Sequence, residues 1–112
     1  MKNEFKTWLE DISIAIKEIK SFIPEPRKFE IFKEDIKTQR AVERNIEIIG
    51  EAVNRIIKEN PSFPIKNARK IVDTRNRISH GYDSVSKEII WAIIIKDLPL
   101  LETEIEALKG GY

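Results

Sequence analysis

Residues 29–60 read FEIFKEDIKTQRAVERNIEIIGEAVNRIIKEN, and their apolar residues recur every three or four positions. That spacing places them on one side of an α-helix, with Glu, Lys and Arg on the other sides. Pro61 and Pro64 follow at the point where such a helix must end. We therefore expect one long amphipathic helix from Phe29 to about Asn60. Its predicted buried side consists of Phe32, Ile36, Val42, Ile46, Ile49, Val53 and Ile56.

Gly50 lies inside this predicted helix. A glycine in a helix interior costs up to ~1 kcal/mol relative to alanine. The position therefore indicates a close helix crossing or the approach of a ligand, unless the glycine is simply tolerated.

Amphipathic helices are also predicted on both sides of this segment. One covers residues 5–23 and ends at Pro24 and Pro26. Another begins near Ile65 and stops at Gly81, because glycine is common just beyond a helix C-terminus. The apolar side of the helix that begins near Ile65 carries Ala68, Ile71, Val72, Arg75 and Ile78.

The run Ile89–Ile95 is apolar on every side, and Ser84 or Ser86 can cap a helix that contains it. Periodicity alone also allows a buried strand, but the chain offers no partner strand, so we expect a helix. An apolar helix in a small bundle has one face more than its own core can cover. The surplus face predicts a homodimer, which could associate further.

The last predicted helix opens at Pro99 and precedes a fraying tail, Gly110–Tyr112. Its apolar side consists of Leu100, Leu101, Ile105 and Leu108. The predicted fold is therefore all-α, an up-down bundle of four to five helices in a single domain over residues 1–112.

Composition excludes several function classes. The chain has 112 residues and no cysteine, so it can form neither a disulfide framework nor a thiolate metal site. With 20 basic and 19 acidic residues, bulk charge cannot drive nucleic-acid binding. The N-terminus has no signal-peptide pattern, and the longest apolar run is far shorter than the ~20 residues of a membrane span. We expect a cytoplasmic protein with no membrane partner.

Potential chemistry concentrates in residues 73–82, DTRNRISHGY, which contain the only histidine. Arg75 falls on the apolar side of its helix, so it needs a partner. An ion pair with Glu47 or Glu51 would supply one. His80 is of the residue type that exchanges protons near neutral pH, although a histidine at a helix C-terminus is also favoured by the helix dipole.

The remaining polar residues of the segment have ordinary interpretations when taken singly. Tyr82 would be a packing residue with its hydroxyl at the surface. Asn76 and Ser79 would bond solvent or the helix terminus, and Arg77 would lie on the solvated face.

Taken together, Arg75-Asn76-Arg77-Ile78-Ser79-His80-Gly81-Tyr82 resembles the R-N-x-x-x-H-x-Y signature of the HEPN superfamily, in its HepT-like toxin branch. Residues 41–52, AVERNIEIIGEA, are similar to that branch's second-helix segment. Residues 97–101, DLPLL, are similar to the start of its last helix. The resemblance therefore covers essentially the whole chain.

This resemblance implies a metal-independent endoribonuclease toxin of a type II or type VII toxin–antitoxin pair, with no cofactor. It implies that Arg75 and His80 are catalytic at a cleft between two subunits, with Asn76 and Ser79 in support. It also implies a partner, a minimal nucleotidyltransferase antitoxin that attaches AMP to Tyr82. One departure is Asp73-Thr74, where relatives often carry a small-apolar pair, so Asp73 could pair with Arg75 or Arg77 and weaken activity.

The residues support such chemistry independently. RNA breaks when its 2′-hydroxyl attacks the neighbouring phosphorus, which requires a base, an acid and a positive charge. Arg75 fits the last role. One chain has one histidine, so we expect a two-fold dimer to bring two His80 side chains to one cleft. AMP on Tyr82 would then exclude RNA by charge and bulk.

Because the net charge is near zero, RNA affinity must come from a local basic cluster. Its predicted members are Arg75, Arg77, Arg69, Lys66 and Lys70. Two alternatives remain open: a non-catalytic RNA- or nucleotide-binding module, which Asp73 favours, and a bundle whose apolar helix around Trp91 docks a nucleotidyltransferase.

Overall fold

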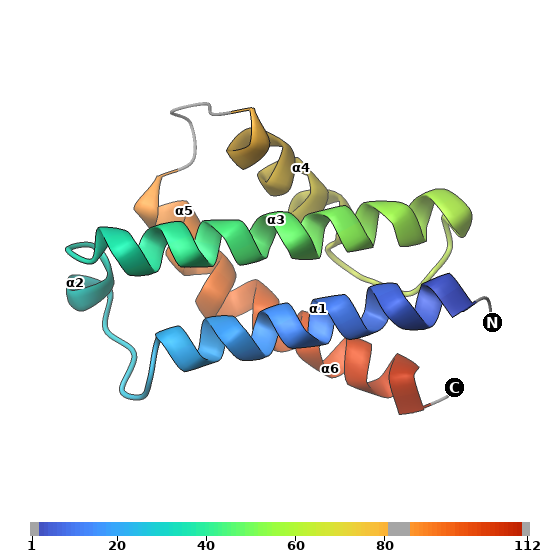
Figure 1. The fold of residues 1–112 in the computed structure, drawn as a ribbon, viewed down its shortest axis with the longest axis horizontal. Helices are drawn as coiled ribbons and strands as arrows, with labels where there is room; N and C mark the ends of the chain where they lie inside the picture. Colours follow the sequence, from blue (N-terminus) through green and yellow to red (C-terminus); the bar gives the residue numbers. More distant parts are fainter. Residues whose placement is uncertain (1–2, 81–85, 111–112) are drawn as a thin grey trace.

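The computed structural model describes residues 3–80 and 86–110, and every regular element within them is helical (Figure 1). These elements are α1 (Asn3–Phe22), α2 (Phe29–Phe32), α3 (Ile36–Glu59), α4 (Ala68–Ser79), α5 (Lys87–Ala92), the π-helical segment η1 (Ile93–Asp97) and α6 (Leu98–Gly110).

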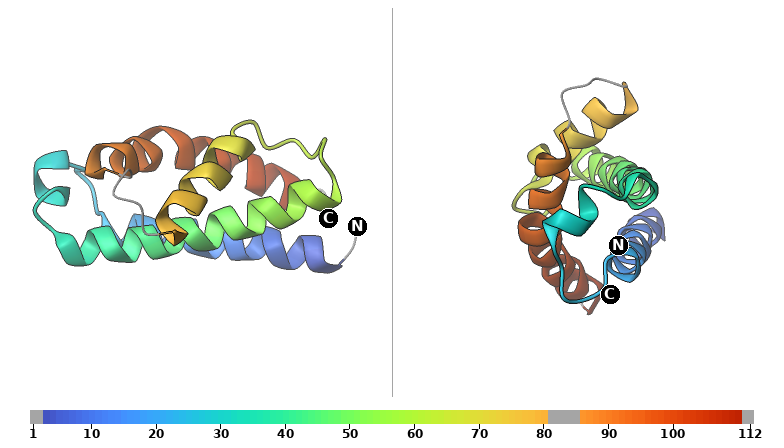
Figure 2. Two further views of the ribbon diagram at one scale, coloured as in Figure 1. Left: turned by 90° about the horizontal axis from the view of Figure 1, so that it is seen from above. Right: turned by 90° about the vertical axis from the view of Figure 1, so that its left-hand side faces the viewer.

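The two longest helices, α1 and α3, run antiparallel along the length of the molecule (Figure 1). The segment α5–η1–α6 passes behind both, and α4 crosses α3 near its middle (Figure 2). One apolar core joins these layers. Its most deeply buried side chains are Leu9, Ile12, Ile16, Ile19, Val42, Ile46, Ile49, Val53, Ile56, Ile90, Leu101 and Ile105. The predicted all-α fold is confirmed.

The prediction of a single helix over residues 29–60 is wrong in one respect, because the helix is interrupted between α2 and α3. Asp35 caps α3 by accepting hydrogen bonds from the backbone N–H of Thr38 at 3.1 Å and its hydroxyl at 2.5 Å. These bonds also lower the pKa of Asp35. Ile36, expected in the core, begins α3 and is 64% exposed.

The third helix begins at Ala68 rather than near Ile65. Phe63 and Ile65 lie in the preceding loop and are buried there, so their apolar character reflects core packing of a loop rather than a helix face. Helix α4 ends at Ser79, and His80 caps it with a backbone N–H bonded to the Asn76 carbonyl at 3.1 Å. The predicted stop at Gly81 lies outside the described residues.

The apolar run is helical as predicted, and Ser86 caps it by accepting from the amide of Ile89 at 3.2 Å. The alternative cap, Ser84, lies outside the described residues. The run continues through η1 into α6, which begins one residue before Pro99. Leu100, expected on the buried side, is 38% exposed, and Gly110 is helical rather than frayed.

Most of the apolar surface of the run Ile89–Ile95, part of which the sequence assigns to a dimer interface, is buried within the same chain. Ile90, Ile93 and Ile94 are buried, whereas Ile89 and Ile95 are 38% and 40% exposed. Trp91 packs against the rings of Phe29 and Phe32, with centroids 5.9 and 5.2 Å away. The predicted dimer remains a prediction.

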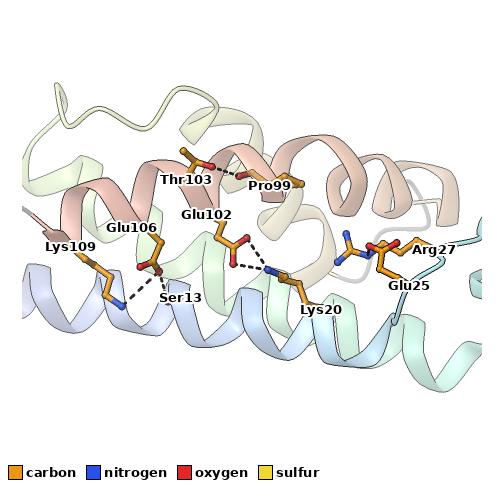
Figure 3. Close-up of polar contacts among 9 residues, drawn as sticks. All are labelled: Ser13, Lys20, Glu25, Arg27, Pro99, Glu102, Thr103, Glu106 and Lys109. Atoms are coloured by element: carbon orange, nitrogen blue, oxygen red, sulfur yellow. Dashed lines mark hydrogen bonds and ion pairs between the residues drawn. The ribbon is translucent and has the colours of Figure 1, made fainter.

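Polar contacts hold α6 against α1 (Figure 3). Lys20 Nζ lies 3.2 Å from both carboxylate oxygens of Glu102, and Ser13 Oγ donates to Glu106 at 3.1 Å. Within the described part of the chain, no helix is long and apolar enough to cross a membrane.

Candidate functional site

Helix α4 approaches α3 closely at Gly50. A methyl group added there would lie 2.7 Å from Cγ of Arg75, nearer still to its Cβ, and 3.3 Å from the Ile71 carbonyl oxygen. Carbon atoms pack at about 3.5–4.0 Å, so only glycine allows this approach. The close crossing inferred from the sequence is confirmed, and it sets the position of Arg75.

Arg75 has the carboxylate partner that its inward position required. Its guanidinium forms an ion pair with Glu51 of α3 and donates to Oδ1 of Asn76 at 2.9 Å. Glu51 also accepts from Nε of Arg55 at 3.1 Å. The guanidinium is therefore held in one orientation by α3 and by its own helix.

Ser79 makes the matching contact one turn further along α4. Its hydroxyl donates to Oε2 of Glu47 at 2.9 Å. Glu47 and Glu51 are four residues apart, so both project from the same side of α3. Together they attach the motif helix to α3 on either side of the Gly50 crossing.

An open groove of about 400 Å³ lies beside these contacts. Arg75 and Ser79 line it from α4, and Glu47 and Glu51 line it from α3. Its remaining lining residues are Trp8, Asp11, Arg44, Ile48, Ala52 and Arg55. The groove suits a ligand with both polar edges and an aromatic or apolar face.

The motif histidine lies at the end of the same helix. His80 is exposed, and Arg75 occurs five residues before it. Tyr82, the predicted site of AMP attachment, lies outside the described residues.

The predicted RNA-binding cations divide into two groups. Arg77 and Arg69 are exposed along α4. Lys70 instead forms an ion pair with the buried Asp97 of η1 at 2.9 Å, and Asn67 donates to the same carboxylate at 3.3 Å. Lys70 therefore also joins α4 to η1.

The sequence left open an ion pair of Asp73 with Arg75 or Arg77. Arg75 pairs with Glu51 instead, and Asp73 is exposed. The carboxylate that restrains Arg75 comes from Glu51 of α3, one of the two partners that the sequence analysis named.

Sequence reasoning missed the contribution of α1 to the groove. Trp8 and Asp11 were assigned to a core-facing helix, yet both line the groove next to Arg44. The available signal was Trp8 itself, since a large ring beside exposed charges is only half-buried.

Comparison with known proteins identifies the family of this chain. The family described as Ribonuclease HepT-like matches residues 12–108. A Thermococcus cleftensis protein named "Probable ribonuclease HepT" is 37% identical over 113 residues, covering 97% of this chain and 99% of its own. A Methanocaldococcus jannaschii protein named as an RNase is 35% identical over 111 residues, covering 96% and 88%. No solved structure matches the chain significantly.

These matches span nearly the full length of both partners in each comparison. The chain therefore belongs to the ribonuclease HepT-like family, and the resemblance drawn from its motif is confirmed.

Proposed function

We propose that this protein is a metal-independent endoribonuclease that cleaves RNA with Arg75 and His80. The observation that carries the proposal is the position of Arg75, which lines an open groove and belongs to the helix that His80 caps. Membership of a ribonuclease family supports RNA as the substrate.

The proposed reaction needs only proton transfer and charge stabilisation. A neutral imidazole removes the proton from a 2′-hydroxyl, the 2′-oxygen attacks the adjacent phosphorus, and the bond to the 5′-oxygen breaks. A protonated imidazole gives its proton to that leaving oxygen. The products are a 2′,3′-cyclic phosphate and a 5′-hydroxyl. Arg75 stabilises the negative charge that builds on the phosphorane oxygens.

Asn76 and Ser79 are positioning residues in this proposal. Asn76 accepts a hydrogen bond from the Arg75 guanidinium, and Ser79 bonds to Glu47 beside it. The Glu51 carboxylate forms an ion pair with the Arg75 guanidinium, so an RNA phosphate must share that guanidinium with Glu51 or displace it.

The second proton-transfer group comes from a second subunit. A two-fold dimer places His80 of both chains around one cleft, where one is the base and the other the acid. Cleavage then shows a bell-shaped dependence on pH, because the pair must hold one proton between them.

Regulation is proposed to act through Tyr82. A minimal nucleotidyltransferase antitoxin attaches AMP to its hydroxyl, which puts a negative phosphodiester two residues beyond His80. The added charge and bulk exclude the RNA phosphate. Arg77, Arg69 and Lys70 complete the proposal as RNA-binding residues.

The test is cleavage of a defined RNA in the presence of a metal chelator, with wild type, His80→Ala and Lys17→Ala at equal concentrations. Lys17 is an exposed residue of α1 and serves as the matched surface control. We expect cleavage by wild type and by Lys17→Ala, and a loss of at least about a hundredfold for His80→Ala. If His80→Ala cleaves like wild type, the proposed chemistry is wrong.

The same experiment distinguishes the non-catalytic alternatives. If unmodified wild type binds RNA without cleaving it, and His80→Ala loses that binding, the protein is an RNA-binding module. If His80→Ala changes neither RNA binding nor RNA cleavage, the motif serves a contact with a partner protein.

A further inference from the structure

A second groove, of about 510 Å³, lies at the opposite end of α4 from His80. The end of α3, the loop that follows it and the first turn of α4 form its walls. Three of its lining residues are cations: Lys58, Lys66 and Arg69. Among the described residues that line it, none is acidic.

Some of the cations that the structure describes are paired with a carboxylate. Lys20, Arg40, Arg55, Lys70 and Lys109 each form an ion pair with a glutamate or aspartate. Within residues 3–80 and 86–110, Lys58, Lys66 and Arg69 form none.

One carboxylate near this segment is bound to the backbone rather than to the three cations. Glu104 of α6 accepts a hydrogen bond from the backbone amide of Lys66 at 3.0 Å, and it does not line the groove. The three side-chain charges therefore remain available to an external anion.

The floor of the groove is apolar. Ile57, Phe63 and Ile65 line it, and the last two are only 7% and 6% exposed. A concave site with an apolar floor and cationic walls matches one or two nucleotides of an RNA strand, since the phosphates are negative and the bases present apolar faces.

The position of the groove relative to the motif adds to this match. Arg69 and His80 are eleven residues apart, which is about three turns of α-helix, so both project from the same side of α4. The rise of about 1.5 Å per residue separates them by roughly 16 Å along the helix. A single RNA strand can therefore lie along α4 and reach both ends.

We infer that this groove, which joins Lys58 to the predicted basic residues Lys66 and Arg69, is a second RNA subsite that anchors the strand a few nucleotides from the bond that is cut. The inference rests on the proposed function for its substrate. It gives RNA affinity to a chain whose net charge is only +1, because three cations line one groove and none of its described lining residues is acidic.

The experiment measures binding of a fluorescently labelled single-stranded RNA of about twelve nucleotides by anisotropy at several salt concentrations. All proteins carry His80→Ala so that the RNA stays intact. One carries Lys58→Gln and Lys66→Gln, and the matched control carries Lys17→Gln and Lys37→Gln, which remove equal charge outside the groove.

Loss of two phosphate contacts lowers the slope of log affinity against log salt by about 1.4. A fourfold rise in salt should then weaken binding about sevenfold less than it does for the control. If the groove variant matches the control in both affinity and slope, the second subsite does not exist.

This outcome is separate from the test of the proposed function. If wild type does not cleave RNA, the binding comparison is made without His80→Ala, so it remains informative. If the groove variant has the same RNA affinity and salt slope as its control, the second subsite is excluded, whether or not His80 cleaves RNA.

Discussion

Gly50→Ala tests whether the close approach of α4 to α3 fixes the position of Arg75. The added methyl group would lie 2.7 Å from Cγ of Arg75 and closer to its Cβ, so the helices must separate locally by roughly 1 Å. Overpacking of this kind costs about 1–3 kcal/mol. Alanine in place of a helical glycine returns up to ~1 kcal/mol. The expected net loss is therefore about 0–2 kcal/mol.

Gly50→Ala should affect the rate of RNA cleavage more strongly than the free energy of unfolding. A displacement of about 1 Å in a group that must meet a transition state can cost about a hundredfold in rate. We therefore expect Gly50→Ala to remain folded in the absence of denaturant and to cleave RNA about a hundredfold more slowly. Urea unfolding gives the stability, and cleavage of a defined RNA gives the rate.

Gly110→Ala is the matched control. A methyl group there would meet no atom within 4 Å, so the substitution should leave cleavage unchanged and cost no stability. If Gly50→Ala behaves like Gly110→Ala in both assays, the crossing does not position Arg75 and the reasoning is refuted.

In protein made inert by His80→Ala, Glu51→Gln should tighten RNA binding by about fivefold, because a negative charge beside Arg75 disappears while a hydrogen-bond acceptor remains. Equal affinities in a binding titration would contradict this. Asp73→Asn should also strengthen RNA binding in that background, since Asp73 is exposed on α4, and unchanged affinity would argue against an RNA path along this helix. Asp35→Ala should lower the melting temperature at neutral pH, but the difference from wild type should shrink below about pH 4. Hydrogen bonds from Thr38 lower the pKa of Asp35, so its stabilisation exists above the unfolded-state value and disappears as pH falls through the folded-state value. A difference that is constant across acid pH would contradict this reasoning.

Apolar spacing predicted the helical fold because each long helix has one buried side. It could not predict the break before α3, since the capping bonds of Asp35 depend on a local backbone turn. It also could not separate helix from buried loop at Phe63 and Ile65, because both structures bury apolar residues equally well.

The candidate site was partly visible in the sequence. Gly50 and the inward position of Arg75 predicted a close crossing and an acidic partner, and the structure contains both. Whether Arg75 pairs with Glu51 or with Glu47 depends on how α4 is rotated against α3. The residue pattern of a single helix does not contain that information. The groove requires α1 as well, so Trp8 became apparent only in the fold.

The most direct test of the account replaces one 2′-hydroxyl of the RNA by hydrogen at a mapped cleavage position, with a chelator present. We expect that wild type no longer cuts at that bond, while neighbouring sites still yield 2′,3′-cyclic phosphate ends. Cleavage of the 2′-deoxy bond at the original rate would show that the 2′-oxygen is not the nucleophile, and would contradict the chemistry assigned to Arg75 and His80.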